Sequence, residues 1–196
     1  MAETTKKEIG LRVSNNIPAL IDDQFLLDGG VIESLDQIDK SFYQVTNMGS
    51  HMKLKDGNST KLDVSIPFIT ISSTSTQTIL KVIKTLKSKL TKLKIEEIQF
   101  REILHFDFDN VLSKTMSKIY ENNQVELDQI RLNGKGFGLD IYECSTDRLH
   151  VNILNRIAFE SDIEIKDLSD DEINKIFNAS QKAREFLTNK LDLTHE

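Results

Sequence analysis

Hydrophobic and polar residues alternate between positions 62 and 71, the pattern that is typical of a β-strand. One parity holds mostly branched or aromatic residues, namely Leu62, Val64, Ile66, Phe68 and Thr70. Ile69 and Ile71 interrupt the other, polar parity, so we expect the end of this strand to be covered on both faces. Pro67 cannot donate a hydrogen bond to a neighbouring strand, which favours an edge position or a bulge.

The next segment changes to the 3.6-residue period of a helix, from about residue 77 to residue 94. Its hydrophobic stripe has spacings of four and three residues and consists of Ile79, Ile83, Leu86, Leu90 and Leu93. Leu80 and Val82 widen this stripe. About two heptads are too few to indicate a coiled coil, so we expect the stripe to pack on the sheet.

Alternation returns between residues 98 and 108 and predicts a second strand, because a helix would spread these hydrophobic residues over several faces. A helical period follows over residues 111–120, and Asn122-Asn123 marks its end. This order of strand, helix, strand and helix is the unit that builds parallel sheets covered by helices.

The C-terminal half predicts shorter strands and a final helix. Alternation indicates strands over residues 125–132, 137–142 and 149–153, and a hairpin turn at residues 133–136. For the strand at residues 149–153, a helix that starts near Ile157 is the alternative. Ser169 and Glu172 form a capping box for the final helix. We therefore predict an α/β fold, with α+β as the alternative. It would have a mixed sheet of about five strands, a βαβα unit, an antiparallel meander and a C-terminal helix.

Residues 1–52 are predicted as an N-terminal helical arm, separate from an α/β domain at residues 53–196. Two short helices are expected, one after Asn15-Asn16 with Pro18 in its first turn, and one over residues 31–43. Residues 49–52 have the sequence Gly-Ser-His-Met, a familiar remnant of expression vectors that normally stands at the start of a chain. Two interpretations stay open: residues 1–47 were fused from another source, or the match is a coincidence.

The composition fits one domain, or one domain with an arm. The chain has 196 residues, of which 38% are hydrophobic and 29% charged. No apolar run approaches the ~20 residues of a membrane-spanning helix, and Met1 is followed by a polar stretch instead of a signal peptide. The single cysteine, Cys144, allows no disulfide within the chain. These features predict a cytoplasmic protein that does not bind membranes.

The charge is unevenly distributed, and this indicates a candidate binding surface. The formal net charge is −6, yet residues 79–94 carry no acidic residue and six lysines: Lys81, Lys84, Lys87, Lys89, Lys92 and Lys94. These lysines could contact the phosphates of a nucleic acid or the carboxylates of an acidic protein. No aromatic residue is interleaved for base stacking. The alternative is a solvated helix face that is neutralised by the acidic C-terminal half.

Five hydroxyl residues before the lysine-rich helix form a candidate anion-binding loop: Ser72, Ser73, Thr74, Ser75 and Thr76. A helix N-terminus offers unpaired N–H groups and the positive end of the helix dipole to an anion. No glycine lets a phosphate approach the backbone, so neither a P-loop nor a dinucleotide fingerprint is present. Ordinary helix capping is the alternative, and we prefer it.

Asp107 and Asp109 form a third candidate, because carboxylates at i and i+2 of a strand point the same way and suit a divalent cation. The string at residues 103–112, hydrophobic residues followed by Asp-x-Asp, resembles the first motif of the haloacid-dehalogenase-type phosphohydrolases. The resemblance implies that Asp107 is the nucleophile and Asp109 the general acid/base, with Mg²⁺ as cofactor. Position 111 is Val where that family most often has Thr. Two carboxylates that cap the next helix are the alternative.

The sequence contains no complete catalytic motif, and its four histidines lack metal-ligand spacing. We therefore expect a non-enzymatic, cytoplasmic interaction or regulatory protein without cofactor or metal. Its lysine-rich helix face would contact an anionic or acidic partner, either protein or nucleic acid. The alternative is a metal-dependent phosphohydrolase-like enzyme that uses Asp107 and Asp109.

Overall fold

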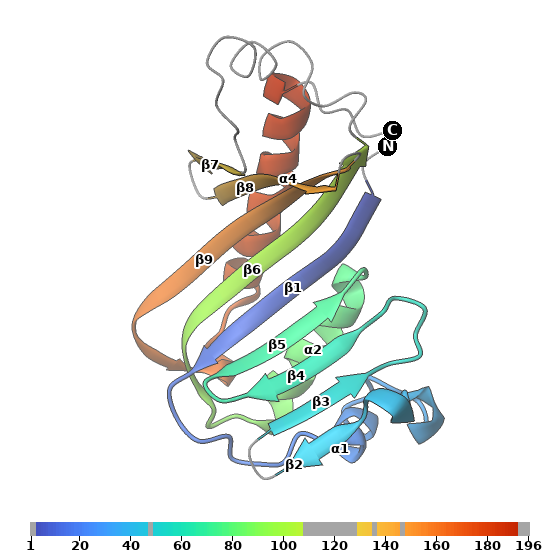
Figure 1. Ribbon diagram of the computed structural model, residues 1–196. Coiled ribbons are helices and arrows are strands. Elements are labelled where there is room, and N and C mark those ends of the chain that lie inside the picture. The colour runs from blue at the N-terminus through green and yellow to red at the C-terminus, as the bar shows by residue number, and fades with distance from the viewer. Residues whose placement is uncertain (1–2, 47–48, 108–128, 135–136, 146–147, 192–196) are drawn as a thin grey trace. The chain divides into compact units, whose positions relative to one another are not determined.

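The computed structural model describes residues 3–46, 49–107, 129–134, 137–145 and 148–191 (Figure 1). The chain forms two compact units. The first unit is Lys6–Phe100 with Arg156–Asn174, and the second is Arg101–Asn155 with Met1–Thr5 and Lys175–Glu196. Three strands contribute residues to both units, namely β1 (Glu3–Val13), β6 (Lys94–Asp107) and β9 (Arg148–Glu164).

The remaining strands belong to one unit each. The first unit holds β2 (Gln44–Thr46), β3 (Gly49–Lys53), β4 (Lys61–Ser65) and β5 (Phe68–Ser73), and the second holds β7 (Gln129–Gly134) and β8 (Phe137–Ser145). Hydrogen bonds join the strands in the order β2-β3-β4-β5-β1-β6-β9-β8-β7. The described helices are α1 (Asp23–Asp28), α2 (Thr76–Lys89) and α4 (Asp170–Leu191), with short 3₁₀ turns at Leu35–Gln37, Lys40–Phe42 and Ile165–Asp167.

The strands are antiparallel, so the predicted α/β fold with a mixed sheet of about five strands is wrong. Ser14, just after β1, donates to the carbonyl of Lys94 at the start of β6 (3.0 Å). Ile165, just after β9, donates to the carbonyl of Leu93 (2.7 Å). The ends of β1 and β9, the two neighbours of β6, therefore lie beside the start of β6, as antiparallel pairing requires. The fold is α+β, an open antiparallel sheet with helices that include a C-terminal one.

The predicted first strand is in fact a hairpin of β4 and β5, which turns at Ile66-Pro67. Leu62 pairs with Ile71 and Val64 pairs with Ile69, and all four side chains are buried. These buried side chains belong to even-numbered residues before the turn and to odd-numbered residues after it, because the chain reverses direction there. This change of parity is why Ile69 and Ile71 seemed to interrupt a single strand.

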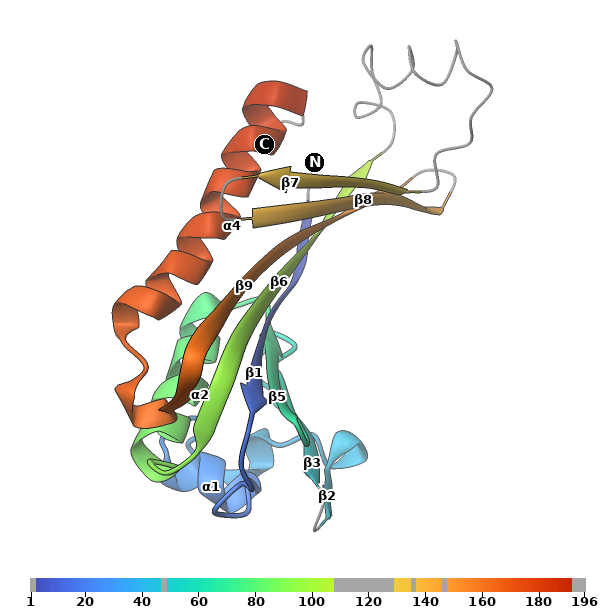
Figure 2. The ribbon, with the colours of Figure 1, turned by 90° about the vertical axis from the view of Figure 1, so that its left-hand side faces the viewer.

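Helix α2 confirms the predicted helix, although it ends at Lys89 instead of near residue 94. The whole predicted stripe is buried, together with Val82. Helix α2 packs in the first unit on β5 and on the 3₁₀ turn Ile165–Asp167 (Figure 2). Leu80 is 37% exposed, so its predicted place in the stripe is wrong. Leu90 closes the helix by donating to the carbonyl of Leu86 (2.8 Å).

The N-terminal residues form strands as well as a short helix: α1 overlaps the first predicted helix, whereas β1, β2 and β3 are strands that were not predicted. β1 pairs with β5 and buries Ile9, Leu11 and Val13, while the only α-helix described before residue 49 is α1. The predicted helix over residues 31–43 is replaced by the two 3₁₀ turns. Residues 49–52 belong to β3, which pairs on both sides, so the predicted boundary after residue 52 falls within a strand.

The second unit has a core of β6, β9 and β8 residues against α4: Leu104, Leu139, Ile141, Val151, Ile153, Ala183 and Leu187. The structure confirms predicted strands in β6, β8 and β9, and the alternative of a helical start near Ile157 is wrong, since β9 continues to Glu164. The capping box before α4 is confirmed in the first unit, where Ser169 and Glu172 bond each other's backbone N–H (2.8 and 3.2 Å).

Some predictions fall on residues that the structure does not describe, namely the helix at residues 111–120, the strand start at residues 125–128, and part of the turn at residues 133–136. The residues of that turn which are described, Asn133 and Gly134, belong to β7. Within the described ranges, no helix combines the length and the apolar character that crossing a membrane requires.

Candidate functional site

The six candidate lysines lie in the first unit, and they differ in whether their ammonium groups contact acceptors of the chain itself. Lys87 donates to the carbonyl of Leu168 (2.6 Å) and reaches the carboxylate of Asp170 (3.4 Å). Lys89 lies 3.7 Å from the carboxylate of Asp28 and above the ring of Phe25. These two ammonium groups are therefore engaged with the chain's own acceptors.

Lys81 and Lys84 differ, because both are exposed and neither ammonium group contacts an acceptor among the described residues. They are one turn apart on α2, so their charges lie on the same side of the helix. No acidic residue lies on α2 to compensate them. Two positive charges are therefore available on this surface.

Lys92 and Lys94 follow α2 and are also exposed. The pKa of Glu164 is held below its usual value, chiefly by the hydrogen bond from Lys166, and the charges of Lys94 and Lys92 add to this effect. A carboxylate of the chain therefore already lies within the field of these two lysines. This makes Lys81 and Lys84 the stronger candidates for contact with an outside anion.

A groove in the first unit runs between α2 and the start of α4, with a cavity volume of about 540 Å³. Its lining joins hydrophobic side chains to charged ones: Leu80, Ile83, Lys84, Lys87, Asp170 and Ile173. Ile83 and Ile173 are buried, while Leu80 is exposed at the rim beside Lys84. The groove thus offers an apolar floor with an uncompensated ammonium group next to it. The sequence predicted the lysines but not this groove, because it depends on how α4 packs.

The hydroxyl loop at residues 72–76 is largely occupied by capping and by internal hydrogen bonds. Ser75 is the N-cap of α2 and accepts from the N–H of Thr78 (3.3 Å). Ser73 accepts from the N–H of Ser75 (3.0 Å), and Thr76 accepts from Lys7 (2.9 Å). Both hydroxyl and N–H of Thr74 bond to the carbonyl of Asn58. These contacts favour the capping alternative, and anion binding at Ser72–Thr76 stays a prediction.

Asp107 is the last residue of β6, and Asp109 lies outside the described residues. The structure therefore does not test their predicted pairing. β6 belongs to an antiparallel sheet and not to the parallel βαβα unit that was predicted for this stretch of the sequence. Within the described ranges, no group of three His, Cys, Asp or Glu side chains is arranged to hold a metal ion.

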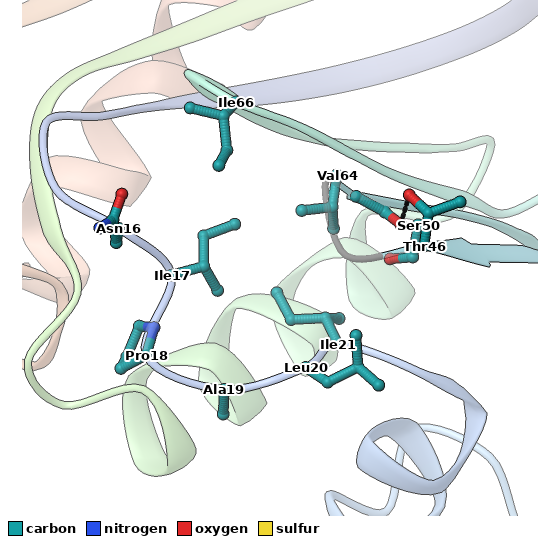
Figure 3. Close-up of a pocket in the computed structure, with 11 residues that line it drawn as sticks. Asn16, Ile17, Pro18, Ala19, Leu20, Ile21, Thr46, Ser50, Val64 and Ile66 are labelled. Carbon is teal, nitrogen blue, oxygen red and sulfur yellow. Dashed lines mark hydrogen bonds between the residues drawn. The ribbon is translucent and has the colours of Figure 1, made fainter.

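A second cavity, of about 520 Å³, lies in the first unit between residues 16–21 and the strands β3 and β4 (Figure 3). Ile17, Val64 and Ile66 surround one space, and Ser50 lies beside Val64. Nothing in the sequence pattern indicated this cavity. The exposed hydrophobic residues Leu20 and Ile66 at its rim could not be recognised as exposed from the pattern alone.

No protein-family model matches this sequence, and a search of the curated proteins also finds no match. The function must therefore be inferred from the geometry of the described residues.

Proposed function

We propose that this chain is a non-enzymatic interaction protein of the cytoplasm that binds an acidic partner through α2. One observation carries the proposal: Lys81 and Lys84 are exposed, lie on one side of the helix, and lack an acceptor among the described residues. Opposite charges three or four residues apart stabilise a helix, and α2 has no acidic residue that could provide them. An outside anion would provide the missing compensation.

The groove beside Lys84 favours a protein partner over a nucleic acid. Nucleic acids bind through phosphates and stacked bases, and the groove lining contains neither arginine nor an aromatic residue. It contains instead the exposed Leu80 above the buried Ile83 and Ile173. We therefore propose that the partner is an acidic protein segment with an apolar side chain that enters the groove.

Lys87 has a supporting role in this proposal. Its bonds to the Leu168 carbonyl and to Asp170 join α2 to the chain just before and at the start of α4. These bonds keep the two walls of the groove together within the first unit. Lys87 should therefore matter for the shape of the groove, while Lys81 and Lys84 supply the free charge.

Fluorescence anisotropy with a labelled peptide of Glu-Glu-Leu repeats tests the proposal on the full chain. We expect binding at low ionic strength that weakens towards ~0.15 M salt, because exposed charges are screened over about 8 Å there. The substitutions Lys81→Glu and Lys84→Glu together should weaken binding by about tenfold, since each exposed ion pair contributes roughly 0.2–1 kcal/mol and reversal adds repulsion. Leu80→Ser should weaken it by about two- to fivefold, because Leu80 is only partly exposed and full burial of a leucine contributes roughly 1.5–3 kcal/mol.

The matched control is Lys55→Glu with Lys182→Glu, which makes the same change in net charge at exposed lysines that do not line the groove. This control should leave binding nearly unchanged. Equal weakening by both pairs would show that only net charge matters, and the proposal would fail. A control peptide of Glu-Glu-Ser repeats should bind less tightly than the Glu-Glu-Leu peptide, because it lacks the apolar side chain. Equal or tighter binding of single-stranded DNA would replace the protein partner with a nucleic acid.

A further inference from the structure

The cavity of Figure 3 is separate from the lysine surface and has a different chemistry. One wall is the segment after β1, residues 16–21, and the other is formed by Gly49, Ser50 and Val64 on adjacent strands. Its volume of about 520 Å³ lies within the range of roughly 300–1,000 Å³ that is usual for small-molecule sites. The size alone therefore permits a ligand but does not define one.

Ser50 provides the observation that points to a ligand. It is only 1% exposed, and its hydroxyl has no hydrogen-bond partner among the residues that the structure describes. Ser50 pairs directly with Val64 across β3 and β4, so the two side chains project from the same face of the sheet, towards the cavity. A buried hydroxyl without a partner is unfavourable, and most such groups in proteins have one. A polar atom of a ligand in the cavity would supply the missing bond.

The lining indicates that this ligand is uncharged. Among the described residues, no Asp, Glu, Lys, Arg or His lines the cavity, and the polar side chains in its lining are those of Asn16, Thr46 and Ser50. The hydroxyl of Thr46 already donates to the carbonyl of Gly49 (3.2 Å). An ionised group would lose its hydration here without gaining a countercharge, which is costly. The remaining wall is aliphatic and suits a hydrocarbon body.

The rim supports the same conclusion. Leu20 and Ile66 are 55% and 56% exposed, the largest exposed fractions among the large hydrophobic residues described. Both line the cavity, so an apolar molecule within it would cover surface that is otherwise left to water. Leu35, 39% exposed on a 3₁₀ turn and not part of the lining, offers a matched control.

We infer that this cavity binds a small, uncharged molecule with an aliphatic body and one oxygen that bonds to Ser50, such as a medium-chain alcohol or ketone. The site is independent of the proposed acidic partner, because the two share no lining residue. The hydroxyl of Ser50 can donate to a ketone or accept from an alcohol. The aliphatic contacts supply affinity, and Ser50 fixes the orientation of the ligand.

The test titrates the ¹⁵N-labelled full chain with 1-octanol and, separately, with octanoate, and follows backbone amide shifts by NMR. We expect saturable shifts at Ile17, Ile21, Ser50 and Val64 with 1-octanol, and binding of octanoate at least tenfold weaker, since its carboxylate lacks a countercharge. Ser50→Ala should weaken 1-octanol binding by about three- to tenfold, as loss of one hydrogen bond predicts. Its melting temperature should not fall, because the removed hydroxyl has no partner within the described part of the chain.

Leu20→Ser should also weaken 1-octanol binding, while the control Leu35→Ser should not. Both replace an exposed leucine, so neither is expected to prevent folding. The inference is overturned if 1-octanol gives no saturable shifts at these residues, if octanoate binds equally well, or if Ser50→Ala binds with unchanged affinity. It is also overturned if Leu35→Ser weakens binding as much as Leu20→Ser, since that indicates nonspecific hydrophobic contact.

Discussion

Removal of Arg184 should destabilise the protein strongly, because Arg184 is the charge partner of the buried Glu102. In the second unit, the Nη2 atom of Arg184 on α4 lies 2.5 Å from one carboxylate oxygen of Glu102 on β6, and Nε donates to the other (3.3 Å). Ser180 donates to the same carboxylate. The Glu102 side chain is fully buried, while that of Arg184 is 26% exposed. The substitution Arg184→Met would remove this cation from a fully buried carboxylate.

The expected loss of folding free energy follows from how deeply the two side chains are buried. Removing one partner of a buried ion pair costs roughly 3–5 kcal/mol, and the partial exposure of Arg184 places our expectation near the lower end, at about 3 kcal/mol. For a chain of this length, that corresponds to a fall in melting temperature of roughly 6–12 °C. Urea denaturation followed by circular dichroism should show a lower midpoint, by about 1–2 M.

A double variant distinguishes loss of charge pairing from general disruption. Glu102→Gln with Arg184→Met removes both charges but keeps an acceptor for Ser180, and it should recover at least half of the lost stability. The reasoning is refuted if Arg184→Met costs less than about 1 kcal/mol, or if the double variant is less stable than the single one.

Two further predictions concern the first unit. Gly49→Ala should destabilise the chain by about 2 kcal/mol or more, because the added Cβ would lie 2.0 Å from the carbonyl oxygen of Val64. The control is Gly10→Ala, whose added Cβ would lie 3.8 Å from Gln99 and should reduce stability little. Equal melting temperatures of the two variants would contradict the place of residues 49–52 in the sheet. Glu164 has a lowered pKa, so its contribution to stability is present above the usual glutamate pKa and is lost as pH falls through the folded value. Glu164→Gln should therefore reduce the decline of melting temperature below about pH 5, and an unchanged pH profile would count against the bond to Lys166.

The individual elements were easier to predict than their arrangement. The stripe of α2 was recognisable because a 3.6-residue period over Ile79–Leu93 is typical of a helix with one buried side, and the capping box at Ser169 and Glu172 is a local pattern. Alternation in β6 and β8 also identified strands. Alternation does not specify which strand lies beside which, so the antiparallel order could not be inferred.

The errors have identifiable physical causes. β1 was missed because its polar beginning obscured the alternation of Ile9, Leu11 and Val13, which lies entirely on one face. The hairpin of β4 and β5 was taken for one strand because its turn, Ile66-Pro67, contains no glycine or asparagine. Ser50 could not be selected at all, since only tertiary packing shows that its hydroxyl lacks a partner among the described residues.

The candidate lysine surface was partly predictable. The absence of acidic residues between positions 79 and 94 was visible in the sequence, but the partners of Lys87 and Lys89 come from distant positions, Asp170 and Asp28. These contacts reduce the candidate surface on α2 to Lys81 and Lys84. They also define the groove, which the sequence did not indicate.

The most direct test of the proposed function is the ratio of two dissociation constants for the Glu-Glu-Leu peptide at low ionic strength. One is that of the Lys81→Glu, Lys84→Glu variant, and the other is that of the charge-matched Lys55→Glu, Lys182→Glu variant. The proposal predicts that the first exceeds the second by about tenfold, because only the first pair lies on the exposed side of α2. A ratio near one, or no measurable binding by the unmodified chain, would contradict it.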